Sequence, residues 1–361
     1  MLAAAAVVAL VMTSCEPSSG DAPAASPSPT TSPVALEPTL RDSAPDGFFV
    51  GVSVGGGGHL GAHSPEDDPA IAQLVTTQFS SVTPENAAKW EVVQPAQGTY
   101  DFTALDAIVD AAQAAGQRVR GHNLLWHQQN PAWLTSGTFT PDELRTILHD
   151  HITTVVGRYA GRIAEWDVAN EIFDDSGVLR SENPWIAALG PGIVADAFRW
   201  AHEADPAAKL FLNDYNLEQS GAKVDAYVKL AQQLLAEGVP VGGIGIQGHL
   251  ATQYGGPSGL QSVIQKFADL GLDVEITELD VRLTNTANVD LLEQGQYYAQ
   301  VVKACLAVAR CTGITVWGVS DKDSWVPTTF PQEGSALLFD EALHPKPSFE
   351  AFRDALSAGR Q

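Results

Sequence analysis

Eight short apolar runs, separated by longer stretches with helical spacing, organise most of this 361-residue chain. The strand-like runs are Phe48–Val54, Phe79–Val82, Arg118–Leu125, Ile163–Val168, Ala208–Leu212, Gly243–Gln247, Leu272–Ile276 and Gly313–Val319. The clearest helical stretches are Leu105–Ala115, Pro141–Tyr159, Val224–Glu237, Leu260–Leu270 and Leu291–Val308. Strands that alternate with amphipathic helices are typical of α/β folds with a parallel sheet. Eight such units predict a single (β/α)8 TIM barrel.

A doubly wound open sheet is the weaker alternative for the same alternation. Such folds often carry a GxGxxG dinucleotide site directly after the first strand. The four glycines at 55–58 lack that spacing and no helix start follows them, so we expect an ordinary loop there. The closed barrel is therefore the preferred prediction.

Polar and aromatic side chains follow every predicted strand after the first. They are Glu85, Asn86, Lys89 and Trp90; His122, Trp126, His127 and Gln129; Asn170 and Glu171; Asn213, Asp214 and Tyr215; Gln247 and His249; Glu278 and Asp280; and Trp317, Asp321 and Trp325. In a barrel the carboxyl ends of the strands converge on one face, where active sites lie. The sequence therefore predicts one cleft lined by these side chains.

Two of these strand ends carry a glutamate after a run of small or β-branched residues. Glu171 ends the WDVANE stretch at 166–171, and Glu278 lies in VEITELD at 274–280. Two carboxyls that face each other across a pocket are the minimum equipment for acid–base or nucleophilic chemistry on a glycosidic bond. Taken alone, two such glutamates could equally be ordinary solvated residues, so the surrounding motifs have to decide.

The motifs at the strand ends resemble those of family 10 of the glycoside hydrolases, the retaining endo-β-1,4-xylanases. They are TPEN at 83–86 with Lys89 and Trp90, GHNLLWH at 121–127, WDVANE at 166–171, NDYN at 213–216, GIQGH at 245–249, ITELD at 276–280, VWG at 316–318, LLFD at 337–340 and PKP at 345–347. The resemblance runs from about Phe48 to Phe352. Ala88 and Asn123 depart from the family's usual Met and Thr, and neither is a catalytic position.

The resemblance implies a double-displacement mechanism that needs no metal and no organic cofactor. Glu171 would be the general acid/base and Glu278 the nucleophile. Asn170 would hydrogen-bond the 2-hydroxyl of the sugar that is cleaved. His249 would hydrogen-bond the nucleophile, with Asp280 as its own partner.

The same resemblance implies a set of residues that hold the sugar chain. Glu85, Asn86, Lys89 and His122 would bind hydroxyl groups on the glycone side, and Gln247 is expected near the catalytic residues. Trp126, Trp317 and Trp325 would offer flat faces to pyranose rings. Gln129 and Trp325 would crowd the position of a hydroxymethyl group, which favours xylose over glucose. The expected partners are therefore xylan and xylo-oligosaccharides.

The overall charge restricts the other partners. A formal net charge of -23 argues against nucleic acid or anionic lipid as a charge-driven partner. After residue 15 no run reaches the roughly 20 apolar residues of a membrane span. We expect a monomer that contacts a membrane only through a lipid anchor.

That anchor is expected at Cys15. Residues 1–15 contain a short apolar run that ends in Thr13-Ser14-Cys15, which is typical of an export signal of the bacterial lipoprotein type. Residues 16–45 are rich in Pro, Ser, Thr and Ala and predict a disordered linker. Residues 46–361 are expected to form the catalytic domain, either secreted or held on the cell surface.

The other two cysteines form a local pair in the sequence. Cys305 and Cys311 would close a small disulfide loop in an exported protein. The alternative is two reduced, buried cysteines near one helix end.

Two other functions stay open at this point. A related retaining β-1,4-glucanase or a mixed-specificity hydrolase would keep both glutamates and differ only in the sugar it accepts. A surface lipoprotein that binds xylan without cleaving it is disfavoured, because Glu171, Glu278, Asn170 and His249 are all intact.

Overall fold

The computed structural model describes residues 36–55, 68–284 and 290–359. The predicted export signal, the proposed lipidation site at Cys15 and most of the predicted linker lie outside these residues, as do three of the four glycines at 55–58. Within the described part of the chain, no helix is both long and apolar enough to cross a membrane.

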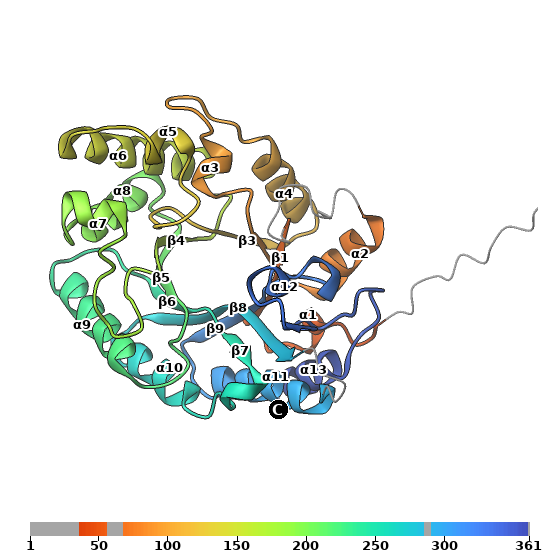
Figure 1. The fold of residues 1–361 in the computed structure, drawn as a ribbon. Coiled ribbons are helices and arrows are strands. Elements are labelled where there is room, and N and C mark those ends of the chain that lie inside the picture. The colour runs from red at the N-terminus through yellow and green to blue at the C-terminus, as the bar shows by residue number, and fades with distance from the viewer. Residues whose placement is uncertain (1–35, 56–67, 285–289, 360–361) are drawn as a thin grey trace, which may run out of the picture. The chain divides into compact units, whose positions relative to one another are not determined.

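Eight parallel strands close into a barrel, which confirms the predicted (β/α)8 fold and excludes the open sheet (Figure 1). They are β1 (Phe49–Val54), β2 (Ser81–Pro84), β3 (Arg118–Gly121), β4 (Glu165–Asn170), β5 (Lys209–Asp214), β6 (Gly243–Ile246), β8 (Asp273–Thr284) and β9 (Cys311–Val316). Each strand pairs with the next in this order, and β9 closes the ring by pairing with β1. All carboxyl ends therefore open on one face.

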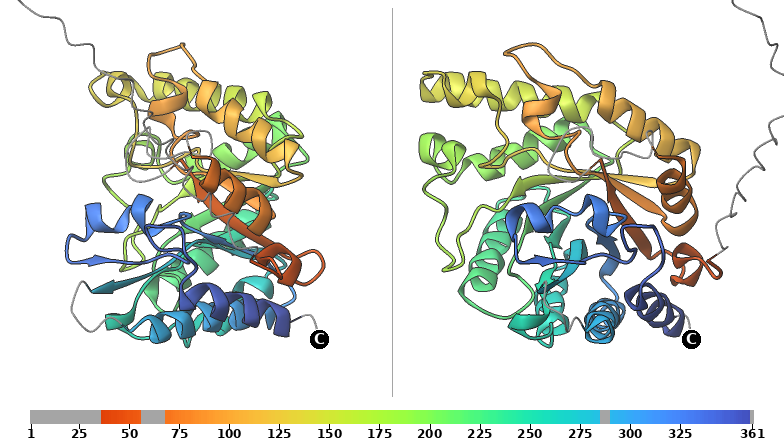
Figure 2. Two further views of the ribbon diagram at one scale, coloured as in Figure 1. Left: turned by 90° about the vertical axis from the view of Figure 1, so that its right-hand side faces the viewer. Right: turned by 45° about the vertical axis from the view of Figure 1, so that its right-hand side comes forward.

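The longer helices surround the barrel on its outer side (Figures 1 and 2). The α-helices are α1 (Leu40–Ser43), α2 (Pro69–Gln78), α3 (Trp90–Val93), α4 (Thr103–Ala114), α5 (Ala132–Thr135), α6 (Pro141–Arg158), α7 (Pro184–Leu189), α8 (Ile193–Ala204), α9 (Ala222–Ala236), α10 (Leu260–Ala268), α11 (Leu291–Leu306), α12 (Val326–Thr329) and α13 (Pro347–Ala358). Two 3-10 turns cover Thr252–Tyr254 and Asp321–Asp323. Local sequence explains where a helix such as α6 begins. Thr140 and Glu143 form a capping box there, and Pro141 lies in the first turn of the helix.

Strand β8 is much longer than the predicted run Leu272–Ile276. Its second half pairs in parallel with β7 (His249–Ala251) and antiparallel with β10 (Glu333–Gly334). Glu278 and Asp280 consequently lie within the strand and not after it. By contrast, regular β3 ends at Gly121, four residues before the predicted end at Leu125, although the Leu125 amide still donates to the Val168 carbonyl at 2.9 Å.

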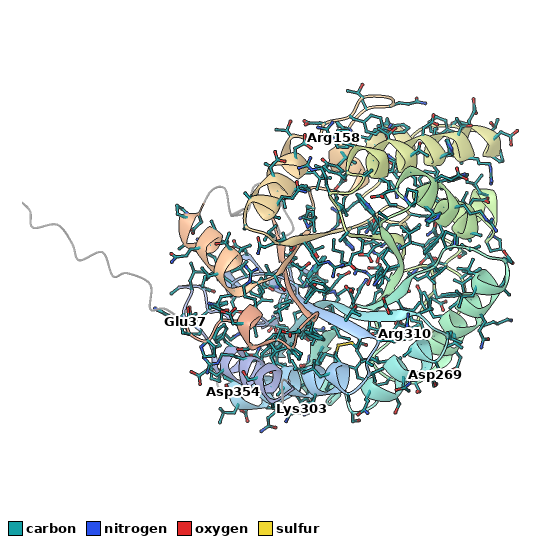
Figure 3. All side chains as sticks on the ribbon, turned by 180° about the vertical axis from the view of Figure 1, so that it is seen from behind. Glu37, Arg158, Asp269, Lys303, Arg310 and Asp354 are labelled. Carbon is teal, nitrogen blue, oxygen red and sulfur yellow. A yellow bond between two sulfur atoms is a disulfide. The ribbon has the colours of Figure 1, made fainter. Side chains whose placement is uncertain are left out.

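The interior of the barrel contains a buried ionic network (Figure 3 shows side chains filling the barrel). Arg120 is only 1% exposed and donates Nε and Nη2 to the two carboxylate oxygens of Asp167. Its Nη1 lies 2.8 Å from Glu275 Oε2 and 3.6 Å from Glu165 Oε1. Burial and the neighbouring Glu165 raise the pKa of Glu275. One guanidinium from β3 therefore holds carboxylates from β4 and β8 together.

The folded unit begins earlier than the predicted boundary at Asp46. Helix α1 packs against α13, α2 and β1, and Leu40 is fully buried. The Leu40 amide donates to the side-chain oxygen of Gln78 at 3.1 Å, and Thr39 caps the helix. Residues from Pro38 onward belong to the barrel unit. The predicted boundary was wrong because one short helix within a Pro-rich stretch has no periodicity to reveal it.

The predicted disulfide between Cys305 and Cys311 is present. Cys305 lies at the end of α11 and Cys311 begins β9, with 5.2 Å between their Cα atoms. The bond ties the end of α11 to the start of β9, the strand that follows it. The alternative of two reduced cysteines does not hold.

Candidate active site

An open cleft of about 580 Å³ lies at the carboxyl ends of the strands. Every residue predicted to bind substrate lines it: Glu85, Asn86, Lys89, His122, Trp126, Gln129, Gln247, Trp317 and Trp325. Glu171, Glu278 and His249 line the same cleft. Asn170 and Asp280 are fully buried behind it. One face of the barrel thus gathers the residues expected to bind and cleave the substrate. Five other strand-end residues that were expected to line the cleft are not among its lining residues: Trp90, His127, Asn213, Asp214 and Asp321.

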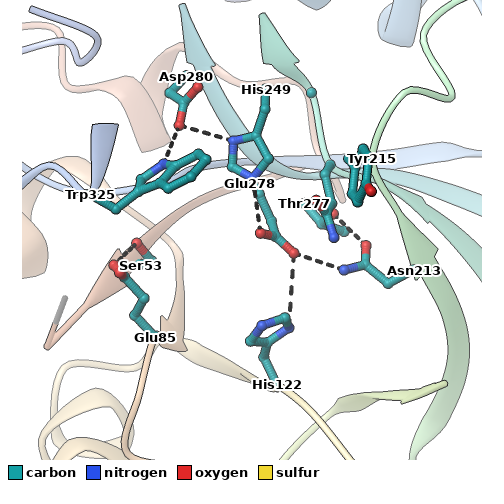
Figure 4. A network of polar contacts seen from close by, with 12 residues as sticks. Ser53, Glu85, His122, Asn213, Tyr215, His249, Thr277, Glu278, Asp280 and Trp325 are labelled. Carbon is teal, nitrogen blue, oxygen red and sulfur yellow. Dashed lines mark hydrogen bonds and ion pairs between the residues drawn. The ribbon is translucent and has the colours of Figure 1, made fainter. Parts of the chain in front are cut away.

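Glu278 projects from β8 into the cleft and is only 4% exposed (Figure 4). Asn213 Nδ2 donates to its Oε1 at 2.8 Å, and His249 Nε2 lies 3.2 Å from its Oε2. Thr277 donates to the Asn213 oxygen at 2.6 Å, which fixes the amide with its nitrogen toward Glu278. Burial alone would raise the pKa of Glu278, but His122 and the hydrogen bond from His249 outweigh it and lower the pKa. The carboxylate is held ionised.

His249 connects Glu278 to a second carboxylate. Its Nδ1 lies 2.9 Å from Asp280 Oδ2, which also accepts the Trp325 indole N–H at 2.7 Å (Figure 4). Burial lowers the pKa of His249, but Asp280 and Glu278 raise it to about 10. The imidazolium therefore donates from both nitrogens at neutral pH, and each carboxylate is oriented by it.

Glu171 follows directly after β4 and has a backbone φ of +53°. This left-handed conformation is uncommon for a residue with a side chain and is found preferentially at functional sites. The Trp126 indole donates to Glu171 Oε2 at 2.9 Å, and Gln247 Nε2 donates to Oε1 at 3.1 Å. Asn170 Nδ2 also donates to Oε1, at 3.4 Å. Among the described residues the carboxyl is thus held by three neutral donors, without a cation bonded to it.

Three amide side chains link the two glutamates. Asn213 Nδ2 donates both to Glu278 Oε1 and to Asn170 Oδ1, each at 2.8 Å. Gln247 Nε2 lies 3.5 Å from Asn170 Oδ1 and 3.1 Å from Glu171 Oε1. A continuous set of polar contacts therefore fixes one carboxyl relative to the other.

Glu85, Asn86 and Lys89 form a second polar group at the cleft wall. Lys89 Nζ donates to Asn86 Oδ1 at 3.1 Å and lies 5.1 Å from the centre of the Trp126 ring. Gln129 Nε2 is 3.4 Å from the same Asn86 oxygen. Burial raises the pKa of Glu85 to about 7 and lowers the pKa of Lys89. Such a group offers donors and acceptors to sugar hydroxyls.

His122 is held by Asp167, a member of the buried ionic network inside the barrel. Its Nδ1 lies 3.0 Å from Asp167 Oδ2 and 3.9 Å from Glu278 Oε1. The ring meets Trp317 edge to face, with 5.2 Å between their centres. Asp167 and Arg120 were not among the predicted site residues. Asp167 lies inside the WDVANE motif, and that position was the only signal for it.

Tyr215 lines the cleft, as predicted, but other cleft residues were missing from the prediction: Gln128, Asn216, Arg282, Thr328, Thr329 and Phe330. Asn216 belongs to the NDYN motif and could have been taken from it. Thr328, Thr329 and Phe330 come from α12 and the residue after it, where no periodic pattern exists. Within the described ranges, no group of three or more His, Cys, Asp or Glu side chains is arranged to hold a metal ion.

Known proteins with a similar sequence are named as xylanases. An endo-1,4-beta-xylanase from Agaricus bisporus is 41% identical over 293 residues, which cover 81% of this chain and 87% of that protein. Endo-1,4-beta-xylanase 1 from Gibberella zeae is 36% identical over 340 residues, covering 90% and 96%.

Solved structures agree with this likeness. Xylanase 10B from Thermotoga petrophila, in complex with xylobiose, has a TM-score of 0.85 and 36% identity, covering 90% of this chain and 98% of that one. Xylanase10C from Cellvibrio japonicus, in complex with xylopentaose, has a TM-score of 0.82 and 31% identity, covering 89% and 69%. The sequence model of glycosyl hydrolase family 10 matches residues 40–355. This chain therefore belongs to glycosyl hydrolase family 10.

Proposed function

We propose that this protein is an endo-1,4-β-xylanase that hydrolyses internal β-1,4-xylosidic bonds of xylan with net retention. The observation that carries the proposal is the pair of buried glutamates joined through Asn170, Asn213 and Gln247. Their environments differ in the way the mechanism requires, because a charged histidine bonds Glu278, whereas the described residues that bond Glu171 are neutral donors. Relatives across most of the chain carry the same activity in their names.

In the first step Glu278 attacks the anomeric carbon while Glu171 protonates the oxygen of the leaving sugar. The glycosidic bond breaks and an ester forms between the sugar and Glu278. In the second step Glu171 removes a proton from water, the water oxygen attacks the anomeric carbon, and the ester bond to Glu278 breaks. Esterification removes the negative charge of Glu278 across the cleft from Glu171, which suits the change of Glu171 from acid to base in the second step.

The supporting residues act on the same centre. Asn170 is proposed to bind the 2-hydroxyl group, a contact that can strengthen as the oxocarbenium-like transition state develops. His249 and Asp280 aim the nucleophile. Glu85, Asn86, Lys89 and His122 would bind the glycone hydroxyls, because neutral sugars repay the desolvation of polar groups with paired hydrogen bonds.

Preference for xylose is proposed to depend on Gln129 and Trp325. Trp325 is fixed by its bond to Asp280 and by edge contact with His249, at 4.9 Å between ring centres. A rigid indole at the place of the hydroxymethyl group would exclude glucose sterically. Trp325→Ala should therefore raise activity on an aryl cellobioside relative to an aryl xylobioside.

The test is a product assay on unbranched xylan and on carboxymethyl cellulose, with wild type beside Glu278→Ala. Short xylo-oligosaccharides from the wild type alone are expected, and proton NMR should show the β-anomer first. Equal cleavage of cellulose would overturn the specificity, α-product would overturn retention, and binding without cleavage would overturn the enzymatic function.

Export is proposed from the sequence of the first residues. Cys15 would be lipidated and residues 16–37 would tether the domain. A fatty-acid analogue should label the wild type and not Cys15→Ala. Continued membrane partitioning of Cys15→Ala would count against the anchor. Size-exclusion chromatography of the domain should give a monomer.

A further inference from the structure

Gln247 and His249 contact the two candidate catalytic carboxyls from one short connection. Gln247 Nε2 donates to Glu171 Oε1 at 3.1 Å, and His249 Nε2 lies 3.2 Å from Glu278 Oε2. Only Gly248 separates the two residues in sequence. The position of the Gly248 backbone therefore affects the aim of both side chains.

Gly248 adopts a backbone conformation that residues with a side chain rarely adopt. Its φ is +81°, in the left-handed region where glycine is the preferred residue. A Cβ atom there would lie 3.0 Å from Ile276 Cγ2, so the backbone passes close to β8. The Gly248 N–H donates to Glu218 Oε1 at 2.9 Å. This hydrogen bond, which we call the Gly248 clamp, joins residues 30 positions apart.

Glu218 is placed for this contact and not for contact with a ligand. It lies in the connection between β5 and α9, is 7% exposed, and is not among the residues that line the cleft. The charged groups that act on it are His249 and Lys223, and burial raises its pKa despite both. A buried carboxyl is unfavourable unless it is hydrogen-bonded. The Gly248 amide supplies such a bond.

We propose that Glu218 is a positioning residue for hydrolysis, which acts through the Gly248 clamp to align Gln247 with Glu171 and His249 with Glu278. The inference rests on the proposed roles of Glu171 and Glu278. Because Glu218 touches neither the cleft nor the carboxyls, its effect should fall on the chemical steps and not on sugar binding at Glu85, Asn86 and Lys89.

Two conservative replacements separate the effect of the length of the Glu218 side chain from the effect of its charge. Glu218→Gln keeps the length and an acceptor oxygen but removes the charge. Glu218→Asp keeps the charge, yet its side chain is one methylene shorter and cannot reach the Gly248 amide. Glu237→Asp, at the exposed end of α9, is the matched control. Each variant is compared with wild type in hydrogen exchange at residues 247–249 and in kcat and KM on an aryl xylobioside.

Glu218→Asp is expected to lose exchange protection at Gly248 and to lower kcat about 10- to 100-fold, with KM changed less than about threefold. Its acid limb of kcat/KM should also move to higher pH, because a displaced His249 lowers the pKa of Glu278 less. Glu218→Gln and Glu237→Asp should stay within about threefold of wild type in kcat.

Three results would overturn the proposal. The first is a Glu218→Asp variant as active as Glu237→Asp, and the second is a Glu218→Gln variant as impaired as Glu218→Asp. The third is unchanged protection at Gly248 in Glu218→Asp. Since exchange is measured without substrate, a wild type inactive on xylan would refute the proposed function alone and would leave the Gly248 clamp decided by the exchange data.

Discussion

Arg120 binds Asp167 through two guanidinium nitrogens inside the barrel, and Asp167 in turn contacts His122. Removal of the guanidinium would leave the buried carboxylate without its counter-ion. Arg120→Met should therefore lower the free energy of unfolding by about 3–5 kcal/mol, measured by urea denaturation. Arg199→Met, which breaks a partly exposed pair with Asp196, is the control and should cost less than about 1 kcal/mol. A loss of unfolding free energy in Arg120→Met as small as that in Arg199→Met would show that the buried ionic network contributes little to stability.

The pH dependence of activity should report the bond between His249 and Glu278. The imidazolium helps to keep the pKa of Glu278 low, so the nucleophile stays ionised into the acid range. His249→Gln removes that charge, and the acid limb of kcat/KM should move to higher pH. His202→Gln, on the exposed side of α8, should leave the limb in place. An unmoved limb in His249→Gln would show that His249 does not set the charge state of Glu278.

A buried histidine should weaken the fold in acid. His151 is fully buried and stacks on Trp90, with 3.7 Å between ring centres, and burial lowers its pKa to about 3. In the unfolded chain His151 takes up a proton near pH 6.5, whereas in the folded chain it stays neutral down to about pH 3. The contribution of neutral His151 to the free energy of unfolding is therefore fully present above pH 6.5 and falls by about 1.4 kcal/mol per pH unit from pH 6.5 toward pH 3. In His151→Phe this part of the slope should disappear.

His151→Phe is a mild replacement because the ring can still stack and Gln94 Oε1 keeps its bond from Trp90 Nε1 at 2.8 Å. Urea denaturation of wild type, His151→Phe and exposed His202→Phe between pH 7 and pH 4.5 measures the three slopes. The wild type and His202→Phe should agree. A slope in His151→Phe as steep as theirs would assign the acid sensitivity to other groups.

The disulfide should contribute to stability through the small loop that it closes. Cys305 and Cys311 are six positions apart, and chain entropy for so short a loop gives about 2 kcal/mol. Reducing agent should lower the free energy of unfolding of the wild type by that amount and leave the Cys305→Ala/Cys311→Ala double variant unchanged. Two reactive thiols in the unfolded, exported protein would refute the bond.

Much of the cleft could be read from the order of the residues along the chain. Once eight strands alternate with helices, a parallel barrel brings every strand's carboxyl end to one face. Polar and aromatic residues such as Asn86, Gln129 and Trp325 then have to meet, whatever the details of the packing. Asn170 and Glu171 needed only the end of β4 to be placed.

The tertiary structure decided the contacts that orient these residues. The extension of β8 depends on pairing with β7 and β10, and the burial of α1 depends on α13, α2 and β1. The Glu218–Gly248 and Arg120–Glu275 contacts join segments 30 and 155 positions apart. Apolar periodicity determines which face of an element is buried, whereas a hydrogen bond between distant side chains depends on strand register and loop path. For that reason the sequence by itself determined the barrel and most of the residues of its cleft, and only the folded chain decided how the two glutamates are held.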